Sequence, residues 1–121
     1  MPTRIIIADD ETIQRMDLKD ILTKQGYLVV GEAGDGVSAV NLAREVRPDL
    51  VIMDIRMPEM DGIELARRAS ELDPDIKIMF ITGFAAVALN SDAAAPRNAK
   101  VLSKPVHLRE LVNEVQKMLA A

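Results

Sequence analysis

The hydrophobic residues of this chain follow two patterns that alternate from one end to the other. Short continuous apolar runs, several of them rich in Ile and Val, occupy residues 4–8, 28–32, 50–53, 77–81 and 101–103. Runs of this length without polar alternation are typical of strands buried on both faces of a parallel sheet. We therefore predict five strands, of which the one at 28–32 is the weakest.

Most of the segments between these runs have helical spacing, and helices are predicted at residues 11–26, 37–46, 62–73 and 108–119. The first and last helices are expected to bury Leu18, Ile21 and Leu22, and Leu108, Leu111, Val112, Val115 and Leu119, respectively. Residues 84–99 are the exception, because Pro96 and its polar neighbours interrupt the pattern. The fourth helix is therefore expected to be short or irregular.

Strand and helix alternate five times, which predicts a doubly wound α/β domain with a parallel sheet, right-handed crossovers and helices on both faces. In open sheets of this kind the ligand crevice lies outside the carboxyl ends of the strands. The residues at those ends are Asp9, Asp10, Asp54, Thr82 and Lys104. Three carboxylates, a hydroxyl and a lysine are thus expected to meet at one edge of the sheet.

This set of side chains suits phosphoryl chemistry on a magnesium ion. Mg²⁺ in proteins takes one or two carboxylates together with waters and a phosphate oxygen. A lysine and a threonine hydroxyl can bind phosphoryl oxygens, and a carboxylate held in line between them can act as a nucleophile. Asp54, which directly follows the buried run at 50–53, is the expected nucleophile. The pattern therefore predicts reversible aspartyl phosphorylation.

Composition narrows the alternatives. The chain has 121 residues, enough for one domain with a single core, and its net charge of -4 argues against nonspecific nucleic-acid binding. It has no cysteine and one histidine, which excludes thiolate and multi-histidine metal sites. No apolar run is long enough for a signal peptide or a membrane span. We expect a cytoplasmic protein without nucleic-acid or membrane partners.

The ordered set of strand-end residues resembles the receiver domain of bacterial two-component response regulators over essentially the whole chain. The matching features are Asp9-Asp10, Asp54 followed by Met57-Pro58 and Gly62, Thr82, and Lys104-Pro105. The resemblance implies a flavodoxin-like sheet with strand order 2-1-3-4-5 and no enzymatic activity. Phosphorylation by a histidine kinase or a histidine phosphotransfer protein would switch a protein–protein interaction surface.

The resemblance also implies a role for each matching residue. Asp54 would be the phosphoacceptor, and Asp10, Asp54 and the Arg56 backbone carbonyl would bind Mg²⁺, with Asp9 assisting through water. Thr82 and Lys104 would bind the phosphoryl oxygens. The Lys104–Pro105 peptide bond would be cis.

Two positions depart from the family pattern. Val101 stands three positions before the lysine, where the family usually has a Tyr or Phe that rotates on phosphorylation, and Val106 stands where Phe is common. The usual coupling between threonine and aromatic residue is therefore in doubt. We expect the irregular segment 84–99 to transmit the switch in place of the aromatic residue. The interaction surface is expected near residues 84–106.

A finer resemblance divides the chain. From about Met60 onward it resembles the CpdR group of single-domain receivers of alphaproteobacteria, which control delivery of substrates to the ClpXP protease. The first half looks more like receivers of ANTAR-type antitermination regulators. The chain is thus a divergent member of the group or a chimera. We expect a single receiver domain over residues 1–121 without an output domain, acting on ClpXP, an associated adaptor or another protein target.

Simpler interpretations stay open, both for single residues and for the function of the whole chain. Asp9 or Asp10 alone would more often cap a helix, and His107 is expected to be a surface or capping residue. A constitutive adaptor that has lost phosphorylation is one alternative function. A phosphatase of the haloacid-dehalogenase type is another, although Arg56 occupies the place of the second acid that such an enzyme needs.

Overall fold

The computed structural model describes residues 2–9, 11–34, 36–55, 76–82, 99–103 and 107–120. These residues form five strands and three helices. The strands are β1 (Arg4–Ala8), β2 (Leu28–Ala33), β3 (Leu50–Ile55), β4 (Lys77–Thr82) and β5 (Ala99–Ser103), and the helices are α1 (Thr12–Lys24), α2 (Gly36–Val46) and α5 (Leu108–Ala120). The third and fourth helices expected from the sequence lie outside the described residues.

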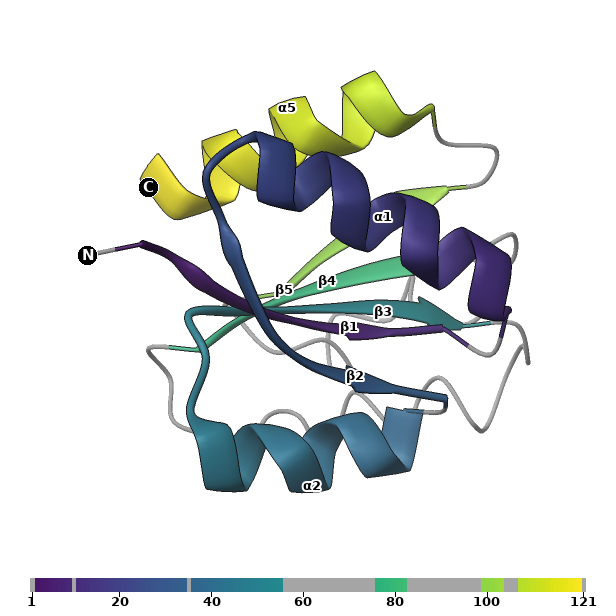
Figure 1. The fold of residues 1–121 in the computed structure, drawn as a ribbon, viewed down its shortest axis with the longest axis vertical. Coiled ribbons are helices and arrows are strands. Elements are labelled where there is room, and N and C mark those ends of the chain that lie inside the picture. Colours follow the sequence, from purple (N-terminus) through teal and green to yellow (C-terminus); the bar gives the residue numbers. More distant parts are fainter. Residues whose placement is uncertain are drawn as a thin grey trace.

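The five strands form one parallel sheet in the order β2-β1-β3-β4-β5. Helices α1 and α5 cover one face of this sheet, and α2 covers the other (Figure 1). The expected doubly wound α/β fold and its strand order are confirmed. All five strands point toward the same edge, where α1 and α5 begin.

The sheet separates two apolar cores. On the side of α1 and α5, buried side chains of β1 and β3 pack against helix residues that include Leu18, Leu22, Leu111 and Val115. On the other side, Ala39, Val40 and Ala43 of α2 pack against the opposite side chains of the same strands. Because β1 and β3 are buried on both faces, their apolar runs do not alternate with polar residues.

The ends of the elements differ in detail from the predicted ones. Helix α1 stops before Gly26, whose φ of 92° is readily adopted by glycine. Strand β3 continues to Ile55, so Asp54 lies within the strand instead of after it. Leu108 was expected to be buried but is 42% exposed, because it stands at the very start of α5.

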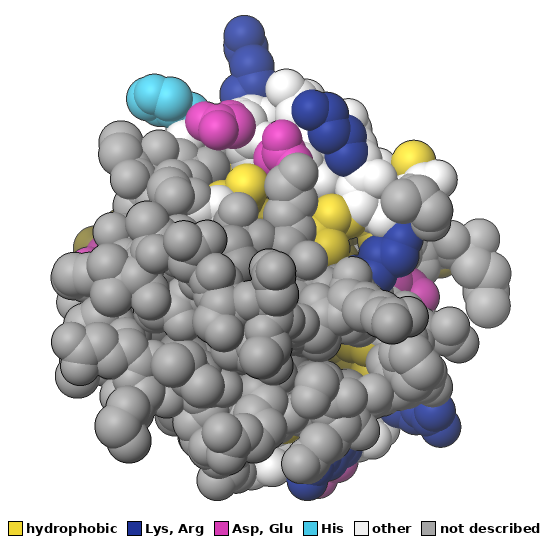
Figure 2. Space-filling model, turned by 180° about the vertical axis from the view of Figure 1, so that it is seen from behind, with side chains coloured by type: hydrophobic (Ala, Val, Ile, Leu, Met, Phe, Trp, Pro, Cys, Tyr) yellow, Lys and Arg dark blue, Asp and Glu magenta, His cyan; other side chains and the backbone are white. Residues whose placement is uncertain are grey.

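The surface of α5 carries charges of both signs beside the exposed His107, as the view from behind shows (Figure 2). Arg109 and Glu110 are exposed there, as expected for a solvated face. Among the described residues, no helix combines the length and the apolar character that a membrane crossing requires.

Candidate functional site at the carboxyl edge of the sheet

Strand register brings the ends of four strands to one edge. Ala8 at the end of β1 lies opposite Met53, so that Asp9 and Asp54 each follow this pair by one residue. On the other side of β3, Ile55 lies opposite Thr82, and Thr82 lies opposite Ser103 at the end of β5. The backbone positions of Asp9, Asp54 and Thr82 therefore converge, as the alternating pattern predicts.

Asp9 is the one buried polar or charged side chain within the described part of the molecule, with 2% of its surface exposed. Its backbone N–H donates to the Ala33 carbonyl at 3.0 Å, which extends the pairing of β1 with β2 by one residue. Its carboxylate Oδ1 accepts the backbone N–H of Glu11 at 2.9 Å. A carboxylate buried to this extent has to be hydrogen-bonded, paired with a cation or bound to a metal.

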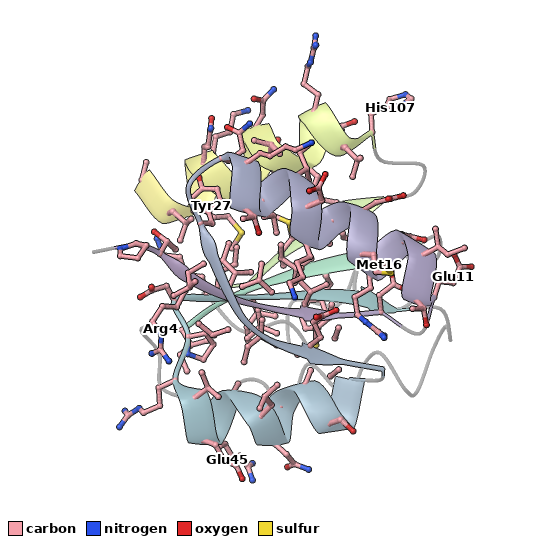
Figure 3. All side chains as sticks on the ribbon, in the orientation of Figure 1. Arg4, Glu11, Met16, Tyr27, Glu45 and His107 are labelled. Carbon is pink, nitrogen blue, oxygen red and sulfur yellow. The ribbon has the colours of Figure 1, made fainter. Side chains whose placement is uncertain are left out.

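The helix-capping interpretation does not describe Asp9. The N-cap of α1 is Glu11, which makes no side-chain cap hydrogen bond, and Asp9 lies two residues before it. Glu11 is labelled at the start of α1, on the edge toward which the strands point (Figure 3). The Asp9 carboxylate thus fixes the loop that leads into α1, at the strand edge.

Most of the other predicted site residues lie outside the described part of the chain. Asp10, Arg56, Lys104, Pro105 and Val106 lie outside the described residues, and for Asp54 and Thr82 the backbone position alone is described. Within the described part of the chain no group of three His, Cys, Asp or Glu side chains could hold a metal ion. The assignments of Mg²⁺ and phosphoryl ligands therefore stay predictions.

The position of the missing switch aromatic lies in the middle of β5. Val101 is opposite Phe80 of β4 in the strand register, and the Phe80 side chain is fully buried. The aromatic residue at this level of the sheet is therefore on β4, inside the core that faces α2.

Arg15 of α1 also contacts the site, although no pattern in the sequence predicted this. Its Nη1 donates to the backbone carbonyl of Asp9, and its Nε donates to Glu32 Oε1 at 3.2 Å. Lys19, one turn further along α1, binds the other oxygen of the same carboxylate at 3.3 Å. Helical periodicity alone shows both residues as polar positions of α1, and only the packing of α1 beside β2 reveals these partners.

Comparisons with known proteins agree with this architecture. The family model described as a response regulator receiver domain matches residues 5–116. The response regulator receiver protein CpdR of Brucella abortus is 60% identical over 118 residues, which are 98% of each chain. The chemotaxis protein CheY of Thermotoga maritima is 38% identical over 118 residues, again 98% of each chain. The similarity to CpdR is thus not confined to the second half.

A solved structure shows the same fold. A chain in the crystal structure of the CheX–CheY–BeF3–Mg complex from Borrelia burgdorferi superposes with a TM-score of 0.81 at 25% identity. The match covers 98% of this chain and 90% of that one. The flavodoxin-like parallel sheet that the resemblance to receiver domains implies is therefore confirmed for this chain.

Proposed function

This chain belongs to the response regulator receiver domain family, and on that premise we propose that it is a switch controlled by phosphorylation of Asp54. The observation that carries the proposal is the convergence of strand ends, which brings Asp9 beside β3 and places Asp54 between β1 and β4. We further propose that residues 1–121 act as a single receiver domain and that their role is regulatory and not enzymatic.

The phosphoryl donor would be a phosphohistidine of a kinase or a phosphotransfer protein. A carboxylate oxygen of Asp54 attacks the phosphorus while the phosphorus–nitrogen bond breaks. The bonding electrons leave with the imidazole nitrogen, which then takes up a proton. The phosphoryl group adds a charge of about -1.5 to -2 at neutral pH. Thr82 and Lys104 would bind its oxygens, so that their strand ends are drawn toward β3.

Asp9, Asp10, Asp54 and the Arg56 carbonyl would hold Mg²⁺, which supplies charge neutralisation for the transferred phosphoryl oxygens. Oxygen donors of this kind are the ligands that magnesium prefers. The buried Asp9 carboxylate fits such a site, since burial of an aspartate is favourable only with hydrogen bonds or a cation. A related structure described above contains beryllium fluoride and magnesium with CheY and CheX, which supports the same chemistry here.

The output would be a contact with another protein. The sequence resemblance to the CpdR group implies a role in regulated proteolysis, and the CpdR of Brucella abortus aligns over 98% of this chain. We therefore propose that the target is ClpXP or an associated adaptor. Phosphorylation would shift a pre-existing equilibrium between two conformations of the interaction surface and would not create a new conformation. With Val101 at the aromatic position, this shift would proceed through residues 84–106 without a rotating tyrosine.

A phosphorylation assay tests the proposal. Wild-type protein incubated with a phosphohistidine donor and Mg²⁺ should shift on a Phos-tag gel, and Asp54→Asn should not. Asp49→Asn is the matched control, since Asp49 lies at the opposite end of the sheet, where it binds the Arg4 N–H. It should be phosphorylated like the wild type.

The alternatives predict different outcomes. A wild-type protein that is never phosphorylated but still binds its target would be a constitutive adaptor. Multiple turnover of a phosphomonoester, lost in Asp54→Asn, would indicate a phosphatase. Either result would contradict the proposed switch. For the output, beryllofluoride with Mg²⁺ should change the binding of purified ClpXP to the wild type and should have no effect with Asp54→Asn.

A further inference from the structure

Arg15 of α1 connects its helix to the loop after β1 and to β2, beside the carboxyl edge of the sheet. It stands in the first turns of α1, and its side chain is 20% exposed. One guanidinium nitrogen donates to the carbonyl of Asp9, and another donates to Glu32 near the end of β2. A planar guanidinium can serve two acceptors at once in a fixed geometry. Arg15 therefore ties the loop after β1 to β2.

The carbonyl that Arg15 binds belongs to the peptide unit between Asp9 and Asp10. The Asp9 N–H is already held by Ala33 at 3.0 Å, and the Asp9 carboxylate accepts the Glu11 N–H at 2.9 Å. With Arg15 on the carbonyl, the main chain of Asp9 is fixed on both sides of its Cα atom. The main-chain conformation of Asp9, the residue that directly follows β1, is therefore fixed in part by a residue of α1.

Glu32 keeps this arginine in place and is itself held twice. Arg15 binds its Oε1 at 3.2 Å and Lys19 binds its Oε2 at 3.3 Å. The Lys19 side chain is 50% exposed and contacts Glu32. Arg15 and Lys19 thus carry the same charge on the same helix and share one partner. Of these two residues, Arg15 also donates a hydrogen bond to the Asp9 carbonyl.

We propose that Arg15 is a positioning residue for the acidic magnesium site, acting through the main chain of Asp9. This inference rests on the proposed function, because it assumes that the acidic pair binds Mg²⁺. The positioning contact of Arg15 and its positive charge predict opposite effects on Mg²⁺ binding. Removing a cation beside a metal site should strengthen Mg²⁺ binding if only electrostatics matter, whereas removing a positioning contact should weaken it.

The experiment compares four full-length proteins by amide NMR during titration with MgCl2: wild type, Arg15→Gln, Arg15→Lys and Lys19→Gln. We expect Arg15→Gln to weaken Mg²⁺ binding about tenfold, the range found for residues that orient metal ligands. Arg15→Lys keeps the charge without the planar fork, and should also weaken binding. Lys19→Gln should stay within about twofold of the wild type, because an exposed charge is largely screened.

A second measurement does not involve the metal. In Mg²⁺-free buffer, the amides of Asp9 and Glu11 should exchange with solvent faster in Arg15→Gln than in the wild type, and Lys19→Gln should leave both rates unchanged. Thermal unfolding identifies any variant that does not fold. If Arg15→Gln is one of these, Arg15→Lys decides the question by the same two measurements.

The outcomes separate this inference from the proposed function. Wild-type protein that shows no Mg²⁺-dependent shifts overturns the magnesium site and, with it, the role of Arg15. Wild-type protein that binds Mg²⁺, together with Arg15→Gln that binds it equally or more tightly, overturns the role of Arg15 alone. Unchanged amide exchange in Arg15→Gln has the same consequence. Weaker binding and faster exchange, both confined to the Arg15 variants, support the inference.

Discussion

Replacing Asp9 by asparagine should stabilise the magnesium-free protein, although it removes a hydrogen-bonding charge. The Asp9 side chain has 2% of its surface exposed, and Asp54 follows the Ala8–Met53 pair by one residue on the adjacent strand β3, which ends at Ile55. Neighbouring strands lie about 4.8 Å apart. Two carboxylates about 7 Å apart repel each other by about 2 kcal/mol at an effective dielectric constant of about 20. Desolvation of the buried charge adds to this cost.

The stabilisation lost by weakening the hydrogen bond of residue 9 is smaller than the repulsion that the substitution removes. Asparagine can still accept the Glu11 N–H that now binds Asp9 Oδ1 at 2.9 Å. A neutral acceptor contributes about 1 kcal/mol less than a charged one. The net expectation is a gain of about 1 kcal/mol in the free energy of unfolding, which corresponds to about 3 to 5 °C in Tm for a domain of this size.

Urea and thermal unfolding in EDTA and in 10 mM MgCl2 measure both parts of the argument. Mg²⁺ should raise the Tm of the wild type by mass action and should have little effect on Asp9→Asn. Asp49→Asn serves as the control, because Asp49 also accepts a backbone N–H, that of Arg4 at 2.8 Å, but lies at the opposite end of the sheet. Asp49→Asn should lower the stability slightly. Asp9→Asn that is destabilised to the same extent in EDTA would refute the electrostatic reasoning.

Three further changes test packing and backbone conformation elsewhere in the described part of the fold. Gly31→Ala should destabilise the protein by about 1 to 2 kcal/mol in urea unfolding, because its Cβ would lie 2.6 Å from Leu42 Cδ2; a stability equal to that of the wild type would show that Leu42 moves aside at no cost. Arg47→Gly should be neutral or stabilising, since Arg47 has a φ of 54°, whereas Arg44→Gly within α2 should cost about 1 kcal/mol; equal losses would contradict this. Lys77→Met should lower Tm and speed amide exchange in the last turn of α5, because Lys77 donates to a carbonyl there; unchanged exchange would argue against this contact.

The fold was predictable because its signals are local and repeated. Apolar runs such as 4–8 and 50–53 are buried in the core, and the end of the first helix at Gly26 follows from the backbone preference of glycine. Topology then carries the strand ends to one edge without further information. Errors of one or two residues, such as the end of β3 at Ile55 instead of Met53, arise because the last pairs of a strand depend on the neighbouring strand.

The candidate site was predictable only as far as topology determines it. The sequence indicates that Asp9 stands at a strand end, but not that its carboxylate binds the loop into α1 or that its carbonyl is bound from α1. The exposure of Leu108 likewise depends on where α5 begins. Contacts of this kind join residues from different elements, and no periodicity along the chain reports them.

The same distinction explains why Arg15 and Asp9 should be considered together. A cluster of carboxylates at the end of a buried strand is unfavourable for folding without a cation, so nearby positive charge stabilises the metal-free state. A lysine or arginine that paired directly with the metal-binding carboxylates would compete with Mg²⁺. Arg15 instead places its charge beside the loop through the Asp9 carbonyl and is itself anchored by Glu32. In this arrangement the arginine both reduces the repulsion before the metal binds and maintains the backbone direction that the metal requires.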